Sequence, residues 1–244
     1  MKQTFFTILE NTPLTSTVYR MVLSGDTEAI TVPGQFVNIK LDGLFLRRPI
    51  SVCDCEDGKL TLVYKVVGKG TEQMSTMPVG TQLDVLTGLG NGYDITKAGA
   101  HALLLGGGVG VPPLYMLAKA LLAQSKTVSV VLGFNTADEV FYEQEFKALG
   151  ANVTVTTVDG SYGKKGFVTD ALPANYEYFF TCGPEPMLKA VYKNTVTEGQ
   201  FSFEERMGCG FGACMGCSCK TVTGYKRICK DGPVLKKEEI LWDA

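Results

Sequence analysis

Polar and apolar residues alternate along the first part of the chain, from about residue 4 to residue 95. Runs such as TFFTILE, TVYRMVLS, QFVNIKL and KLTLVYKVV combine this alternation with β-branched and aromatic residues, which is typical of half-buried strands. Glycine, proline and aspartate separate the runs at intervals of about 8–12 residues, as in a small antiparallel barrel or sandwich. We expect one helix there, over GTEQMSTM, with Thr71 as its N-cap. The pattern predicts an antiparallel β-barrel over residues 1–97.

The rhythm changes after residue 97, where short apolar runs alternate with longer amphipathic ones. HALLL, TVSVVLGF, VTVTTVD and EYFFTC are predicted strands, and PPLYMLAKALLAQ, EVFYEQEFKALG and GPEPMLKAVYKNT are predicted helices. Strands that alternate with helices of this length form parallel βαβ units, so residues 98–199 are predicted to form a doubly wound α/β domain. Residues 200–244 are rich in cysteine and glycine and have few apolar positions, so we expect a metal to stabilise this segment.

Composition and charge exclude several classes of protein. The chain has 244 residues, 45% of them hydrophobic, and a net charge of -2, which indicates an ordinary globular protein of about two domains. No basic run is dense enough to neutralise a nucleic-acid backbone, so no nucleic-acid partner is expected. No apolar run is long enough for a signal peptide or a membrane span, so we expect a cytoplasmic protein without membrane contact. In that reducing compartment, clustered cysteines favour metal binding over disulfides.

Four of the eight cysteines lie in MGCGFGACMGCSC, at residues 207–219. Cys209, Cys214 and Cys217 follow the pattern C-x4-C-x2-C, and Cys229 follows at a distance, which is the spacing of a plant-type [2Fe–2S] site. Structural zinc is the main alternative, but it normally uses paired C-x2-C knuckles or histidine, and the single histidine lies far upstream. Cys219 is the alternative fourth ligand. We favour Cys229 because Cys219 follows Cys217 too closely to lie on a distant arm.

A glycine-rich stretch, LLLGGGVGVPPLYML, joins the first predicted strand of the α/β domain to its first helix. Gly106, Gly108 and Gly110 would let the backbone turn tightly and approach a pyrophosphate at the positive end of the helix. The alternative is a tight turn without a ligand. The strand, turn and helix context favours nucleotide binding.

The spacing of these glycines, G-x-G-x-G-x-x-P, resembles the nicotinamide-binding half of the ferredoxin–NADP reductase superfamily. A second motif of that superfamily, Cys-Gly-Pro after the last strand, matches Cys182, Gly183 and Pro184 in FFTCGPEPML. The resemblance implies that Cys182 lies beside the reacting nicotinamide carbon. The alternative is that this cysteine is a small buried packing residue.

The choice between NADH and NADPH depends on the end of the second strand of the α/β domain. Superfamily members that prefer NADPH usually carry an arginine there, whereas this chain has GFNTADEV, with Asn135, Asp138 and Glu139. Carboxylates repel a 2′-phosphate and can accept a ribose hydroxyl, so NADH is favoured.

The same resemblance implies that the barrel binds FAD. The superfamily motif R-x-Y-[ST] corresponds to RPIS, in which an arginine offers a charge-assisted bond to the pyrophosphate and isoleucine replaces the stacking tyrosine. Tyr64 is a candidate substitute for that ring, or an ordinary packing residue. TGLGNGY at residues 87–93 resembles a glycine-rich loop near the flavin. The predicted flavin contacts are Arg48, Pro49, Ile50, Ser51, Val63, Tyr64, Lys65, Gly70 and Thr71.

Nicotinamide, flavin and cluster together make a converter between two-electron and one-electron transfer, because a flavin can take an electron pair and release its electrons singly. The three parts use nearly the whole chain and leave no segment for an organic substrate. The motifs RRPIS, LGGGVGVPPLYMLA, TCGPEPMLKAV and MGCGFGACMGCSC resemble the electron-transfer subunits of type B dihydroorotate dehydrogenases.

That resemblance implies a catalytic partner subunit that holds FMN, two copies of each subunit in a heterotetramer, and electron flow from dihydroorotate through FMN, cluster and FAD to NAD⁺. One alternative is the flavin subunit of an NADH-dependent ferredoxin oxidoreductase or a sulfide dehydrogenase. The other is a nucleotide-sensing regulatory module with a structural metal.

Overall fold

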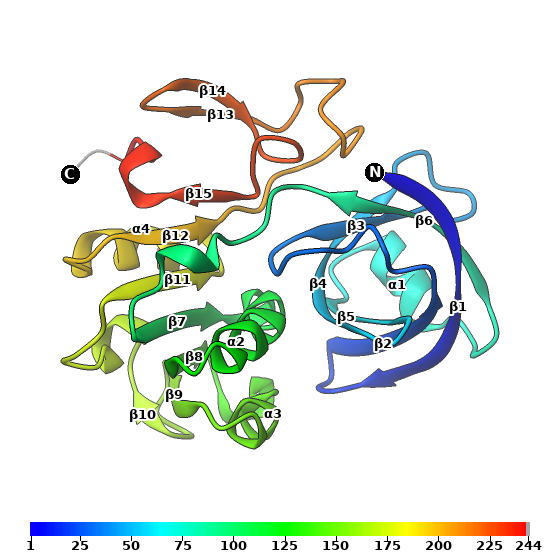
Figure 1. Ribbon diagram of the computed structural model, residues 1–244. Coiled ribbons are helices and arrows are strands. Elements are labelled where there is room, and N and C mark those ends of the chain that lie inside the picture. The colour runs from blue at the N-terminus through cyan, green and yellow to red at the C-terminus, as the bar shows by residue number, and fades with distance from the viewer. Residues whose placement is uncertain (243–244) are drawn as a thin grey trace.

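A closed antiparallel barrel forms the N-terminal part of the chain in the computed structural model, which describes residues 1–242 (Figure 1). The strand order around the barrel is β1-β2-β5-β4-β3-β6, and β6 closes it against β1. Apolar side chains such as Phe6, Met21 and Leu62 fill the interior. The strands are β1 (Lys2–Pro13), β2 (Val18–Gly25), β3 (Phe36–Ile39), β4 (Arg48–Glu56), β5 (Lys59–Lys65) and β6 (Gln82–Leu89).

Two local predictions within the barrel were wrong. Thr71 is not the N-cap of the short helix α1 (Lys69–Ser75), which begins after Gly68. Thr71 is the third residue of the helix, and its hydroxyl reaches back to accept the backbone N–H of Val67 at 2.9 Å. The stretch predicted as a glycine-rich loop from residue 87 still belongs to β6 as far as Leu89.

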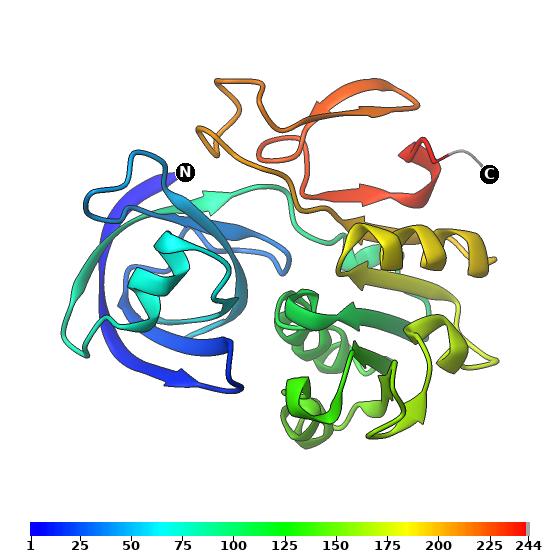
Figure 2. The same ribbon diagram turned by 180° about the vertical axis from the view of Figure 1, so that it is seen from behind.

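A seven-stranded sheet forms the second layer of the molecule (Figures 1 and 2). Its order is β10-β9-β8-β7-β11-β12-β15, with every neighbouring pair parallel except β12 and β15. The strands are β7 (His101–Gly107), β8 (Thr127–Phe134), β9 (Asn152–Thr157), β10 (Lys164–Lys165), β11 (Tyr178–Cys182), β12 (Gly199–Ser202) and β15 (Val234–Lys236).

Helices cover both faces of this sheet. Leu114, Leu117 and Leu121 of α2 (Pro113–Ala123) belong to one buried cluster, which also contains Phe146 of α3 (Glu143–Ala148). Leu188 of α4 (Glu185–Asn194) belongs to a second cluster with apolar side chains of β7 and β11. The doubly wound architecture is therefore confirmed. Short 3-10 turns lie at Ile95–Lys97, Gly108–Gly110, Ala137–Glu139, Val168–Ala171 and Lys237–Glu239.

The second predicted helix of this domain is shorter than its sequence pattern indicates. The predicted segment is residues 139–150, but α3 begins only at Glu143, because Tyr142 adopts a left-handed conformation with φ of 66°. This turn buries the Tyr142 ring, which packs edge-on against Tyr115 with the ring centroids 5.3 Å apart. Tertiary packing has overridden the local helical preference.

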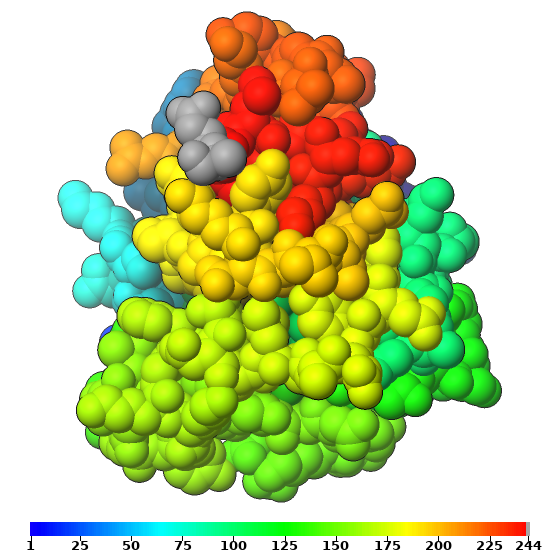
Figure 3. All heavy atoms as spheres, turned by 90° about the vertical axis from the view of Figure 1, so that its left-hand side faces the viewer, coloured from blue at the N-terminus to red at the C-terminus, as the bar shows by residue number. Residues whose placement is uncertain are grey.

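The last part of the chain adds a strand to the large sheet and a small hairpin above it. The predicted division at residue 199/200 falls inside β12, and β15 pairs antiparallel with that strand. Residues 218–227 form the hairpin of β13 (Ser218–Thr221) and β14 (Gly224–Arg227). Figure 3 shows this segment, in orange and red, stacked on α4 in yellow. Leu235 and Ile228 share a buried cluster with Phe179 of β11, so the sheet supplies the core that the segment lacks by itself.

Within residues 1–242, no helix is both long enough and apolar enough to cross a membrane.

Candidate functional site

The cysteine loop brings four thiols together in two pairs. The sulfur of Cys214 accepts the backbone N–H of Cys209, and the sulfur of Cys209 accepts the N–H of Cys214, both at 3.4 Å. The sulfur of Cys217 accepts the N–H of Cys229, also at 3.4 Å. Further amides of the loop point at the same sulfurs, including that of Ala213 at 3.2 Å from Cys209. Two pairs of thiolates with N–H groups aimed at the sulfurs are the donor set of a two-iron cluster.

The ionisation of these thiols depends on the loop around them. Burial opposes ionisation of Cys209, but the backbone N–H groups of Phe211, Cys214 and Ala213 outweigh it and lower its pKa to about 6. Burial, with the neighbouring Cys217 thiol, raises the pKa of Cys229 to about 12. Iron supplies the positive charge that a buried thiolate needs. Within residues 1–242, no three histidine, cysteine or carboxylate side chains converge on a single-ion site.

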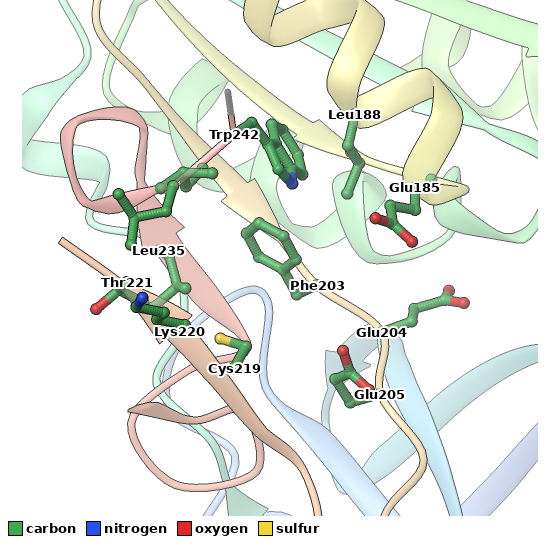
Figure 4. Close-up of a pocket in the computed structure, with 13 residues that line it drawn as sticks. Glu185, Leu188, Phe203, Glu204, Glu205, Cys219, Lys220, Thr221, Leu235 and Trp242 are labelled. Atoms are coloured by element: carbon green, nitrogen blue, oxygen red, sulfur yellow. The ribbon is translucent and has the colours of Figure 1, made fainter. Parts of the chain in front are cut away.

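Cys219 lies apart from these pairs. It is on β13, opposite Lys226, and lines a cavity with Phe203, Leu235 and Trp242 (Figure 4). Burial raises the pKa of its thiol. The contacts therefore support Cys229 as the fourth ligand, which stays a prediction.

Single replacements by serine distinguish the two cysteines. We expect Cys229→Ser to lose the cluster, because the buried pair with Cys217 is broken, and Cys219→Ser to keep two irons per chain. Iron analysis and the visible spectrum of the two purified variants measure this directly. Loss of iron in the Cys219→Ser protein alone would reverse the assignment.

The glycine loop lies against the Cys-Gly-Pro motif. Gly106 pairs with Cys182 across β7 and β11, and a Cβ atom on Gly110 would overlap the carbonyl of Cys182. Gly108 has a φ of 51° and open space around it. Gly183 is buried and Pro184 is exposed. The structure therefore brings the predicted nicotinamide residues together at the carboxyl ends of the central strands, where nucleotides bind in open α/β sheets.

Cys182 itself is 3% exposed and lies opposite Ser202 of β12. Burial raises the pKa of this thiol well above its ordinary value, so the side chain is neutral. A neutral, buried thiol is suited to packing beneath a ring rather than to nucleophilic or acid–base chemistry. Its predicted place beside the nicotinamide stays a proposal.

The acidic stretch that favours NADH follows β8. Glu139 accepts hydrogen bonds from the side-chain amide of Asn135 at 2.8 Å and from its backbone N–H at 3.1 Å, while Asp138 is exposed. The preference for NADH over NADPH stays a prediction.

Two adjacent arginines begin the predicted flavin motif, and the structure distinguishes them. One guanidinium nitrogen of Arg47 lies 3.0 Å from each carboxylate oxygen of Asp84, and the other donates to the backbone carbonyl of Asn38. Arg48 bonds carbonyls of its own loop, and its guanidinium lies where a Cβ on Gly70 would be. The Arg47 side chain is thus bonded within the barrel. The Arg48 side chain lies beside the start of α1, as a pyrophosphate ligand would require.

The other predicted flavin contacts lie on two strands of the barrel, β4 and β5. Pro49, Ile50 and Ser51 are half-buried on β4, and Ile50 packs against the barrel core. Val63 of β5 lies in the same buried cluster as Cys182, which links the flavin strand to the nicotinamide loop. Lys65 is half-buried at the end of β5.

Tyr64 does not present its ring to a ligand. The side chain is 2% exposed, stacks on Tyr19 with the centroids 6.0 Å apart, and donates its hydroxyl to Asn11 at 3.0 Å. Of the two interpretations of Tyr64, the packing residue is the one that these contacts support. We propose that any contact of Tyr64 with the flavin uses its backbone.

Polar contacts hold the barrel against the sheet layer. Lys119 of α2 makes ion pairs of 2.9 Å with Asp54 and Glu56 of β4, and Cys53 contacts the hydroxyl of Tyr142 at 3.3 Å. The two predicted nucleotide surfaces are therefore fixed relative to one another. The arrangement defines a flavin and nicotinamide oxidoreductase fold with an added cysteine segment.

Comparison with known proteins identifies the family. The family described as "Iron-sulfur cluster binding domain of dihydroorotate dehydrogenase B" matches residues 204–241, and "Oxidoreductase NAD-binding domain" matches residues 104–193. The chain is 44% identical to "Dihydroorotate dehydrogenase B (NAD(+)), electron transfer subunit" of Geobacillus sp. (strain WCH70), covering 99% of both chains. It is 42% identical to the protein of the same name from Fusobacterium nucleatum subsp. nucleatum, covering 96% of both. The chain belongs to the family of dihydroorotate dehydrogenase B electron transfer subunits.

Solved structures agree with the fold. A structure described as "Insights into flavin-based electron bifurcation via the NADH-dependent reduced ferredoxin-NADP oxidoreductase structure" is 32% identical, with a TM-score of 0.89 over 97% of this chain and 90% of that chain. A ferredoxin NADP⁺ reductase from Neisseria gonorrhoeae, solved with bound FAD and NADP, is 16% identical with a TM-score of 0.69. It covers 80% of this chain and 90% of that chain, and it supports the fold alone.

Proposed function

We propose that this chain is the electron-transfer subunit of an NAD-dependent dihydroorotate dehydrogenase. In this function electrons leave a catalytic partner subunit that holds FMN and reach NAD⁺ by way of the [2Fe–2S] cluster and FAD. The observation that carries the proposal is the set of four paired thiols, three of them on a loop that packs directly on the predicted flavin barrel and the fourth just after β14. Membership of the electron-transfer subunit family supports a separate catalytic partner.

The chain uses FAD, a [2Fe–2S] cluster and NAD. FAD, when bound, exchanges electron pairs with the nicotinamide and single electrons with the cluster. The residues of the chain position these groups. Arg48 would hold the FAD pyrophosphate, and the open space at Gly108 would admit the dinucleotide, with Gly106 and Gly110 packing the loop closely against its neighbours. The irons would be held by Cys209, Cys214, Cys217 and Cys229.

The finer points of the assembly are proposals. We place two copies of this chain and two of the catalytic subunit in one complex, and the complex in the cytoplasm, where thiols remain reduced. Pyrimidine biosynthesis would be the consumer of the orotate that the partner produces.

A second candidate function has one specific observation in its favour. The similarity to the NADH-dependent reduced ferredoxin–NADP oxidoreductase structure spans 97% of this chain, so electron exchange with ferredoxin is the second candidate. An FMN-containing partner supports the first function, and a partner that exchanges electrons with ferredoxin supports the second.

The decisive experiment begins with the chain purified without air. We expect one FAD and two irons per chain, with NADH bleaching the flavin. Addition of the FMN subunit should then allow dihydroorotate to reduce NAD⁺. Zinc in place of iron would contradict the cluster, and flavin binding without reduction by NADH would favour the nucleotide-sensing module.

Arg48→Ala tests the flavin surface. Removing a charge-assisted hydrogen bond costs about 1.5–3 kcal/mol, so we expect roughly 10–100-fold weaker FAD binding with the cluster retained. Fluorescence of released flavin and iron analysis measure both. Arg20→Ala, at an exposed ion pair of the same barrel, is the control and should retain FAD. Unchanged FAD binding in Arg48→Ala would show that the pyrophosphate lies elsewhere.

A further inference from the structure

Asn38 joins the predicted flavin barrel to the cysteine loop. It lies on β3, directly opposite Pro49 of the flavin motif, and is 1% exposed. Its side-chain amide donates to the backbone carbonyl of Cys209 at 3.4 Å. A Cβ on Gly210 would overlap the same amide nitrogen, so the loop packs directly on Asn38. The first predicted iron ligand is therefore anchored to the strand that pairs with the flavin motif.

Packing alone does not account for an asparagine at this position. The other residues of β3, Phe36, Val37 and Ile39, are buried and apolar. The side-chain oxygen of Asn38 is buried, and it has no hydrogen-bond partner among residues 1–242. Burying such an acceptor is unfavourable, and an apolar side chain of similar shape would avoid the penalty. A buried polar group kept against this cost indicates a role beyond stability.

The surrounding contacts hold Asn38 rigidly. Arg47 donates to the backbone carbonyl of Asn38 at 3.3 Å and to that of Asp84 at 3.0 Å, while its second guanidinium nitrogen pairs with the Asp84 carboxylate. These bonds join β3 to β6 where the two strands are also paired, from Asn38 to Leu86. The Asn38 amide that contacts the cysteine loop therefore extends from a strand that is held in place by hydrogen bonds on its other side, and the position of this donor is fixed.

We propose that Asn38 is a positioning residue for electron transfer between FAD and the cluster. Its amide holds the backbone of Cys209 against the strand pair β3–β4 and so fixes how the cluster sits relative to the flavin. The cluster sulfurs and the Cys209 carbonyl are all acceptors, so a donor at this place also affects the electronic environment of the cluster. The inference rests on the FAD and cluster of the proposed function, but it does not depend on which partner subunit docks.

Asn38→Leu, which removes the donor and keeps an apolar side chain of similar size, tests this role. In the full chain loaded with FAD and cluster, we expect NADH to reduce FAD at the wild-type rate. Reduction of the cluster should be about 10–100-fold slower, as is typical when a hydrogen-bond partner of a metal ligand is lost. Rapid-freeze paramagnetic resonance follows the reduced cluster, whose g-values should also shift. Stopped-flow absorbance follows FAD.

A second variant and a control complete the experiment. Asn38→Ala removes the amide donor without adding bulk or charge, so it gives the answer if Asn38→Leu does not assemble. Asn194 makes a similar bond, from its amide to the carbonyl of Ala190 at 2.8 Å, at the end of α4 and away from the flavin barrel and the cysteine loop. Asn194→Leu should leave cluster reduction and g-values unchanged.

The outcomes separate this inference from the proposed function. Wild-type rates and g-values in an assembled Asn38 variant would overturn the role of Asn38 and leave the proposed function standing. A wild-type cluster that NADH does not reduce through FAD would overturn both.

Discussion

Cys214→Ser yields a protein that binds FAD and is reduced by NADH but passes no electrons to its catalytic partner. Cys214 is exposed on the loop, and its sulfur receives N–H groups from Cys209 and Gly216. A serine hydroxyl remains protonated near neutral pH, whereas iron–sulfur clusters are held by thiolates. We therefore expect complete loss of the cluster. Iron content, NADH bleaching of FAD and NADH-driven reduction of the partner's FMN measure the three consequences.

Cys55→Ser is the matched control for this variant. Cys55 is half-buried on β4, away from the cysteine loop, and its replacement should leave iron and transfer intact. If Cys214→Ser also prevented NADH from reducing FAD, the order nicotinamide, FAD, cluster would be wrong. Normal transfer to the partner in a protein without iron would show that the cluster is not on the electron path.

Local pattern was enough to predict most of the fold. The run TVSVVLGF is β8 with the predicted bounds, because a continuous apolar run between turns has few other solutions in a parallel sheet. The pattern did not predict elements whose structure depends on residues far away in the sequence. β6 was missed because its end resembles a glycine loop, although its apolar positions alternate regularly with half-exposed ones. The pairing of β12 with β15 joins segments about 35 residues apart, and no local signal indicates it.

The site shows the same division between local and distant information. The spacing of Cys209, Cys214 and Cys217 was sufficient to predict a cluster, because a short glycine-rich loop must bring those thiols together. Sequence could not tell which arginine of RRPIS is free, since the ion pair of Arg47 with Asp84 spans 37 residues. The role of Asn38 was missed for the same reason. The one available signal was a polar residue in the otherwise apolar run QFVNI.

Gly110→Ala interrupts the electron path at its other end. The new Cβ would overlap the carbonyl of Cys182, which is sheet backbone and cannot move aside as a flexible side chain does. Relieving the overlap shifts the glycine loop or the Cys-Gly-Pro turn, at a cost of about 1–3 kcal/mol in stability. Displacement of the nicotinamide site by about 1 Å slows transfer roughly 100-fold, so we expect that loss in the rate of FAD reduction by NADH. Thermal unfolding and stopped-flow absorbance measure the two effects.

Gly150→Ala, just after α3 and outside the glycine loop, serves as the comparison, because a Cβ there meets no atom within 4 Å and adds only the strain of a positive φ. It should reduce the rate far less than Gly110→Ala. Both variants should retain FAD and the cluster, since neither glycine lies against the four thiols or Arg48. Gly110→Ala and Cys214→Ser can also be tested in complex with the catalytic subunit. In Gly110→Ala, dihydroorotate should still reduce FAD through the cluster. In Cys214→Ser, only NADH should reduce FAD. Wild-type rates with NADH in Gly110→Ala would show that the nicotinamide does not depend on the packing of this loop against Cys182. If Gly110→Ala loses FAD reduction by NADH and Cys214→Ser loses FAD reduction by dihydroorotate, then FAD lies between the cluster and the nicotinamide.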